Sequence, residues 1–100
     1  MVGAGGLLVE LVQDRSVALP PVDLDGAHRM LDRLKVRRLL DGFRGNPAAD
    51  IDAVARAVVS VSVIATELGE GLAALDVNPI RCGPVGVVAL DALAVASAPR

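Results

Sequence analysis

Aromatic side chains are almost absent from this sequence of 100 residues, in which Phe43 is the only one and Trp and Tyr do not occur. Proteins that bind single-stranded nucleic acids stack the bases on aromatic rings, so the composition argues against that class. The net charge of -2 supplies no basic surface for a DNA duplex either. We therefore expect no nucleic-acid partner and a core built from Val, Leu, Ile and Ala.

Cysteine and long apolar runs are also scarce. Cys82 is the only cysteine, so the chain can form no internal disulfide and no cysteine-based metal cage, and we expect a reducing, cytoplasmic setting. The longest apolar tail, residues 86–98, is interrupted by Asp91 and falls short of the roughly 18 residues that span a membrane. The segment Met1–Leu8 has no positive charge ahead of its apolar residues, unlike a signal peptide. We expect a soluble chain with no membrane partner.

What remains is the composition of one small globular domain. Hydrophobic residues make up 53% and charged residues 22% of the chain, which is typical of a packed protein rather than a disordered one. The length corresponds to about one domain, so we treat residues 1–100 as a single unit.

The amino-terminal part predicts a hairpin. Residues 7–13 have the composition of a strand, Asp14 and Arg15 offer a turn, and residues 16–19 suggest a second strand ended by two prolines. The glycines in residues 3–6 precede a strand instead of opening a helix, and no Gly-Lys-Ser/Thr follows them. Neither a Rossmann fingerprint nor a P-loop is therefore indicated.

Two helices should follow. Asp23 is a plausible N-cap for the first, whose apolar positions recur at helical spacing from Leu24 to Leu34. The basic residues 35–38 are expected at its C-terminal end, where the helix dipole favours cations. The single histidine, His28, is better explained as a surface residue than as a ligand, because the chain has no second histidine to join it.

The second helix should begin after a loop at residues 42–47. Asp50 is its expected N-cap, its apolar positions continue to Leu68, and Gly69 should end it. Within this span residues 59–63 alternate as a β-strand would and are rich in β-branched side chains. The longer helical pattern and its two end signals favour a helix.

The last third predicts two strands, residues 73–80 and 86–93, joined by a turn at residues 83–86. If that turn is tight, antiparallel pairing places Arg81 opposite Val88 and Asn78 opposite Asp91, and directly opposed residues share a face. Asp76 lies two residues from Asn78 on the same strand and so shares that face as well.

This face gathers three oxygen-bearing side chains, those of Asp76, Asn78 and Asp91. Mg²⁺ prefers oxygen ligands and is usually held by one or two protein groups together with water and phosphate oxygens. On spacing alone, polar residues on a solvated sheet face explain the pattern better than a metal site does. Pro79 favours a site, because it holds Asn78 extended and removes a donor from the strand ladder.

Four segments, taken in order, resemble the ATP-grasp domain of ADP-forming acetyl-CoA synthetases and, more distantly, the succinyl-CoA synthetase β subunit. They are Gly5–Glu10, Leu39–Pro47, Asp50–Ala53, and the closing hairpin with Leu75–Ile80 and Gly86–Ala92. The resemblance implies an α+β fold: an antiparallel hairpin, two to three helices and a closing antiparallel hairpin, forming the carboxy-terminal part of the second ATP-grasp subdomain. Leu93 departs from the pattern, since relatives often carry Arg at this position.

The resemblance also implies a site. Asn78 and Asp91 become ligands of the Mg²⁺ that carries the phosphates of ATP or ADP, with Asp76 in support. Glu10, in a family-like strand, is a candidate contact to the nucleotide, with a solvated strand face as an equal alternative. Arg44, between two glycines, is a candidate phosphate contact, with an ordinary surface arginine as the alternative.

Much of such an enzyme is missing from these 100 residues. The resemblance implies an acid–CoA ligase that interconverts acyl-CoA, ADP and phosphate with carboxylic acid, CoA and ATP. It also implies CoA-binding and ligase domains or subunits as partners, without which the chain should be inactive. The alternative is a non-catalytic regulatory or interaction module that keeps the fold. In either case uncovered apolar sheet surface should favour a partner or self-association.

Overall fold

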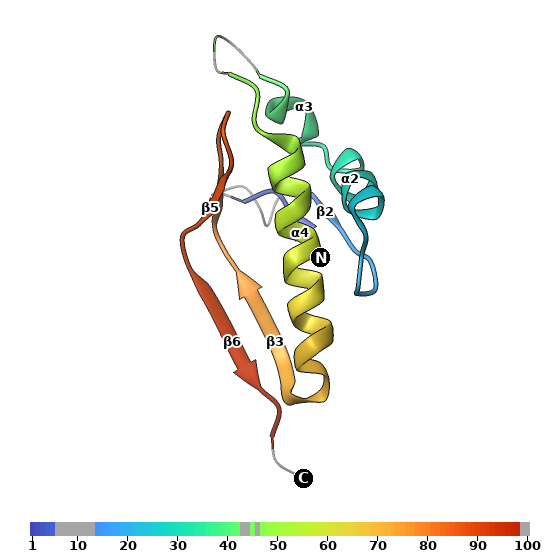
Figure 1. Cartoon of the computed structure of the whole chain (residues 1–100). Helices are drawn as coiled ribbons and strands as arrows, with labels where there is room; N and C mark the ends of the chain where they lie inside the picture. The colour runs from blue at the N-terminus through green and yellow to red at the C-terminus, as the bar shows by residue number, and fades with distance from the viewer. Residues whose placement is uncertain (6–13, 43–44, 46, 99–100) are drawn as a thin grey trace.

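The computed structural model describes residues 1–5, 14–42, 45 and 47–98, and these form an α+β fold (Figure 1). In chain order the elements are β1 (Val2–Gly3), β2 (Arg15–Ser16), α2 (Leu24–Asp32), α3 (Arg37–Leu40), α4 (Ile51–Leu68), the 3₁₀ turn η1 (Gly69–Gly71), β3 (Leu72–Val77), β4 (Ile80–Cys82), β5 (Val87–Ala89) and β6 (Ala92–Ala96). All strand pairs are antiparallel: β1 with β2, β3 with β6, and β4 with β5. The expected fold class, helices between antiparallel hairpins, is confirmed.

The amino-terminal hairpin differs from its prediction. β2 pairs with β1, with Val2 opposite Ser16 and Gly3 opposite Arg15. Arg15 is therefore a strand residue and not part of a turn, and the strand predicted over residues 16–19 ends at Ser16. The pairing stops because β1 is only two residues long. The strand predicted over residues 7–13 lies outside the described residues.

Helix α2 begins as predicted. The Asp23 carboxylate accepts the Gly26 N–H at 2.7 Å and so caps the helix. The helix ends at Asp32, and Leu34, although beyond it, is buried at 5% exposure. The prediction that the basic residues 35–38 lie at the C-terminal end of α2 is wrong. These residues follow the helix and lead through a turn into α3.

Asp14 holds this turn in place. Its buried carboxylate accepts the backbone N–H groups of Lys35 at 2.6 Å and Val36 at 2.8 Å. The helical spacing of apolar residues continues into this segment and predicted a longer helix. A contact between residues so far apart in the sequence leaves no local pattern, so it could not be included in that prediction.

Helix α4 confirms its prediction at both ends. Asp50 accepts the Ala53 N–H at 3.1 Å, and Gly69 follows the last helical residue with a φ of 51°, a conformation that glycine adopts at little cost. Residues 59–63, which alternate as a strand would, are helical. Val58 and Val59 pack against the core cluster, so tertiary contacts support the helix where β-branched residues weaken it.

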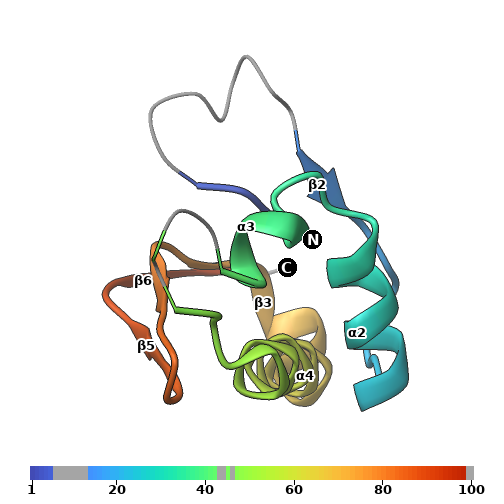
Figure 2. The ribbon, with the colours of Figure 1, turned by 90° about the horizontal axis from the view of Figure 1, so that it is seen from above.

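The core lies between α2 and α4, which run beside each other (Figure 2). Its fully buried cluster is small and aliphatic: Ala27, Leu31, Leu34, Val54 and Ala55. His28 lies on α2 at the rim of this interface, 31% exposed, with its Nε2 atom 2.9 Å from a carboxylate oxygen of Asp52 on α4. The histidine is thus a partly exposed contact between two helices.

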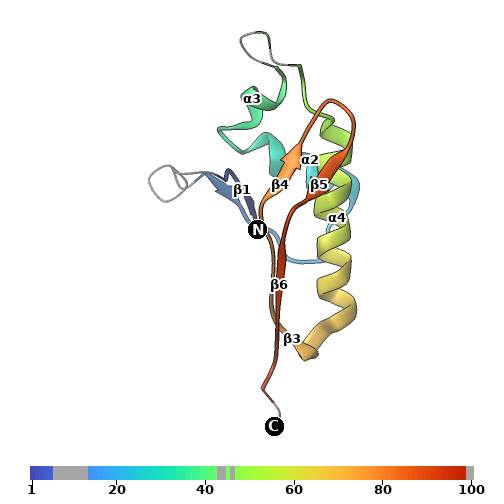
Figure 3. The ribbon, with the colours of Figure 1, turned by 90° about the vertical axis from the view of Figure 1, so that its left-hand side faces the viewer.

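The closing segment is one long, interrupted hairpin. β3 and β6 form its base, β4 and β5 form its tip, and α4 lies along β3 (Figures 1 and 3). Each predicted strand is divided in two, with breaks at residues 78–79 and 90–91. The turn at residues 83–86 is confirmed, and Gly86 has a φ of 73° there.

The chain leaves much apolar surface exposed. Its accessible surface is 7331 Å², against roughly 5300 Å² for a compact monomer of this mass. All five residues of β6 are exposed, including Leu93 at 63% and Val95 at 44%. Within the described residues, no helix is long and apolar enough to cross a membrane.

Candidate functional site

The predicted register of the closing hairpin is correct. Arg81 pairs with Val88 in the tip, and Val77 pairs with Ala92 in the base. Between these two ladders the Asn78 N–H donates to the Asp91 carbonyl oxygen at 3.0 Å. Asn78 and Asp91 are therefore opposite each other, although both lie in the break between the strands.

Asp76 lies on the same stretch of the hairpin, where it pairs with Leu93. Burial along β3 shows which face it belongs to: Leu75 and Val77 are half-buried, whereas Ala74 and Asp76 are exposed. Because side chains alternate along a strand and α4 packs on β3, Asp76 points to the face away from the helix.

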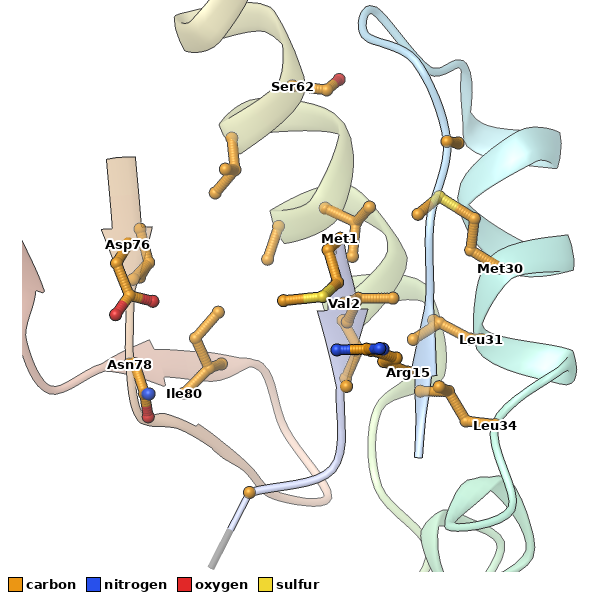
Figure 4. Close-up of a pocket in the computed structure, with 18 of the residues that line it drawn as sticks. Met1, Val2, Arg15, Met30, Leu31, Leu34, Ser62, Asp76, Asn78 and Ile80 are labelled. Carbon is orange, nitrogen blue, oxygen red and sulfur yellow. The ribbon is translucent and has the colours of Figure 1, made fainter. Parts of the chain in front are cut away.

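A cavity of about 1030 Å³ opens beside β3 (Figure 4). Every residue from Leu72 to Ile80 lines it, and consecutive strand residues can do so only where a cavity lies along the strand's edge. Its other walls come from β1, β2, α2 and α4 and are mostly apolar. Asp76 and Asn78 give this cavity a polar end, and both side chains are seen on the β3 side in Figure 4.

Asp91 is placed differently. Its carboxylate Oδ1 accepts the N–H of Ala92 at 2.8 Å, and the residue is not among those that line the cavity. Within the described residues there is no group of three or more His, Cys, Asp or Glu side chains close enough to hold a metal ion. The structure thus brings Asp76 and Asn78 to one cavity and places Asp91 across the hairpin from Asn78.

Two further candidates, Glu10 and Arg44, lie outside the described residues. A residue that the sequence did not single out is Arg15, the only Lys or Arg among the described residues that line the cavity. Figure 4 shows it between the β3 wall and the α2 wall. The sequence offered no signal for it, because Arg15 was assigned to a turn and only the pairing of β2 with β1 turns it toward the cavity.

The tip of the hairpin is fixed to the start of α4 by Asp50. The carboxylate of this residue accepts the Gly86 N–H at 3.0 Å and the Ala53 N–H at 3.1 Å, and its own N–H donates to the Gly83 carbonyl oxygen at 2.7 Å. The two accepted backbone bonds, that from Gly86 foremost, hold the pKa of the Asp50 carboxyl below its ordinary value. Asp50 therefore sets the position of the hairpin that carries Asn78 and Asp91.

Comparison with known proteins identifies the fold. The family model described as an ATP-grasp domain matches residues 1–95. The chain belongs to the ATP-grasp family. It is 36% identical over 91 residues to acetate–CoA ligase [ADP-forming] I of Archaeoglobus fulgidus, a match that covers 91% of this chain and 13% of the ligase. It is 35% identical over 92 residues to the β subunit of acetate–CoA ligase [ADP-forming] I of Pyrococcus furiosus, covering 92% of this chain and 39% of that subunit.

Solved structures agree with the sequence relatives. The dinucleotide forming acetyl-coenzyme A synthetase 1 of Candidatus Korarchaeum cryptofilum, in complex with coenzyme A and Mg-AMPPCP, superposes with a TM-score of 0.87 at 35% identity. That match covers 95% of this chain and 44% of the other. The same synthetase in its apo form gives a TM-score of 0.86 at 33% identity, covering 92% of this chain and 44% of the other. This ATP-grasp chain spans less than half the length of each of these relatives.

Proposed function

We propose that this chain is the Mg²⁺–nucleotide-binding portion of an ADP-forming acyl-CoA synthetase, an acid–CoA ligase. The similarity to ADP-forming acetate–CoA ligases over more than nine-tenths of the chain supports this function. The chain covers 39% of a relative's β subunit and 13% of a one-chain relative. We therefore expect it to act only with partners that supply the rest of the ATP-grasp domain and the CoA-binding and ligase domains.

The observation that carries the proposal is the pairing of Asn78 with Asp91. It places a residue with an amide oxygen directly across the hairpin from a residue with a carboxylate. Asp76, which carries a second carboxylate, lies two residues before Asn78 in β3. Oxygen atoms of these types suit Mg²⁺, which keeps positions for water and for phosphate oxygens. Bound there, the metal would stabilise negative charge on the nucleotide phosphates during phosphoryl transfer.

The chain's own residues have separate roles in this proposal. Asn78 and Asp91 would hold the metal, and Asp76 would bind or orient it from the cavity side. Asp91 can offer its second carboxylate oxygen, because only Oδ1 accepts a hydrogen bond from the described residues. Glu10 and Arg44 remain proposed nucleotide contacts. Arg15 adds a cation in the cavity that Asp76 and Asn78 line, where a guanidinium group suits phosphate oxygens.

The test is an amide NMR titration of the chain with Mg²⁺ and then with ADP. We expect shifts centred on residues 76–78 and 91 that are reversed by EDTA and abolished in Asp91→Ala. The matched control is Asp25→Ala, which removes an exposed carboxylate on α2 and should leave the shifts unchanged.

Other results would contradict the site. Shifts that persist in Asp91→Ala would place the metal elsewhere. A dispersed spectrum that responds to neither ligand would instead indicate the non-catalytic module that keeps the ATP-grasp fold.

A further inference from the structure

Strand β6 (Ala92–Ala96) is an exposed strand without a charge. Its sequence is Ala-Leu-Ala-Val-Ala, and all five residues are exposed. Among the described residues only β3 pairs with it, so one edge of the strand is open. Edge strands of soluble proteins usually carry a charged residue, a proline or a bulge that prevents pairing with another chain. The five residues of β6 include no charge and no proline, and the bulge in its ladder with β3 lies on the β3 side, between Leu72 and Ala74.

The hydrogen bonds of the hairpin show which backbone groups face that open edge. The Asp91 carbonyl accepts from Asn78, and the Ser97 N–H donates to the Gly71 carbonyl at 3.0 Å. The odd-numbered residues of this segment therefore direct their backbone groups toward the β3 side. By the alternation of a strand, Ala92, Ala94 and Ala96 direct theirs outward.

We propose that two copies of this chain pair through β6, antiparallel, about a two-fold axis that passes beside Ala94. The outward groups of Ala92, Ala94 and Ala96 would then form about six hydrogen bonds between the copies. The result is a continuous four-stranded sheet in the order β3, β6, β6, β3. A two-fold contact of this kind closes on itself and forms a dimer rather than a fibre.

Side-chain complementarity is the reason for choosing a second copy as the partner. In this register Leu93 lies opposite Val95 of the other copy, on the face away from α4, and small alanines oppose each other on the α4 side. Asp91 lies opposite Ser97 of the other copy, so no like charges meet. The strand has no polar side chain of its own that would recognise a polar or charged partner.

The open edge of β3 does not offer the same match. It borders the cavity that Asp76 and Asn78 line, so pairing two β3 edges would bring two Asp76 carboxylates into one apolar interface, where like charges are destabilising. The inference does not rest on the proposed function, because it is argued from the open edge of β6, although Leu93 shares the face that carries Asp76.

The experiment measures the mass of the whole chain by sedimentation equilibrium over a range of concentrations. The monomer has a mass of 10.2 kDa, and we expect the mass to rise to twice that value. In Ala94→Lys and in Ala94→Glu, the residues at position 94 of the two copies carry the same charge and meet at the two-fold axis. Each substitution should therefore raise the dimer dissociation constant by about tenfold or more. An equimolar mixture of A94K and A94E should restore the dimer, because opposite charges then meet.

Two controls separate this interface from others. Val85→Lys changes an equally apolar residue in the hairpin turn, 91% exposed, and should leave the dimer intact. Circular dichroism of both Ala94 variants checks that the monomer still folds. A monomeric unmodified chain, a dimer unaffected by either substitution, or a mixture that stays monomeric would each overturn the proposal.

Discussion

At the scale of single residues, Asp50 connects the start of α4 to the turn of the closing hairpin. One carboxylate oxygen caps α4 and the other accepts the Gly86 N–H from the turn of the closing hairpin. Both bonds favour the ionised form and lower the pKa of Asp50 in the folded chain. A group with a lowered folded pKa contributes stability above its unfolded pKa, which is about 4 for Asp, and that contribution is lost as the pH falls through the folded pKa.

The lowered pKa of Asp50 leads to a prediction for Asp50→Asn. The amide oxygen of Asn can still cap α4, but its NH₂ group cannot accept the Gly86 N–H. We expect a lower free energy of unfolding at pH 7 and a smaller loss of stability on acidification, so that the two proteins converge in strong acid. Urea unfolding at several pH values between 7 and 2 measures both effects. Asp25→Asn is the control, and a variant with the parent's full acid dependence would contradict the assignment.

At the scale of elements, the fold depends on the packing of α2 against α4. Leu31 is 1% exposed and is the largest fully buried side chain of that interface. We expect Leu31→Ala to lower the free energy of unfolding by about 2–5 kcal/mol, because it removes buried methyl groups and leaves a cavity. Leu24→Ala, on the same helix but 40% exposed, should cost much less. Equal losses from the two substitutions in denaturant unfolding would show that α2 is not held by its buried face.

At the scale of the whole molecule, the core is small for the length of the chain. Among the described residues, six hydrophobic side chains are buried while thirteen large ones are exposed, and the accessible surface exceeds that of a compact protein by more than a third. Unfolding therefore exposes about a fifth less surface than it would for a compact chain of this mass. At concentrations where the chain is monomeric, we expect a urea m-value near or below about 1 kcal/mol/M. A value near that of a fully packed domain would contradict this description.

Part of the fold followed from the sequence because its causes are local. Asp23 and Asp50 precede apolar runs at helical spacing, and both cap a helix. Gly69 ends α4 because a φ of 51° suits glycine. The hairpin turn at residues 83–86 fixes the register, and the register places Asn78 opposite Asp91. Once the turn is known, antiparallel pairing sets which residues oppose each other as far as Ala74 and Val95, beyond which a bulge shifts the register.

The amino-terminal hairpin could not be predicted in the same way. β1 and β2 are two residues each, too short for a pattern, and they are joined through residues 4–14. The cavity beside β3, and with it the placement of Arg15, depends on how β1, β2, α2 and α4 are arranged around that strand. Such an arrangement is set by contacts between distant residues, which leave no periodic signal in the sequence.

The sequence by itself determined the helices α2 and α4 with their N-caps, the register of the closing hairpin as far as its bulge and, through its resemblance, the ATP-grasp family. These features depend on residues close together in the chain or on residues opposed across one turn. The tertiary structure decided that Asp14 holds the turn after α2, that Asp50 holds the hairpin tip, and that no described strand pairs with the outer edge of β6. Each of these is a contact, or an edge left open, that the packing of distant segments creates.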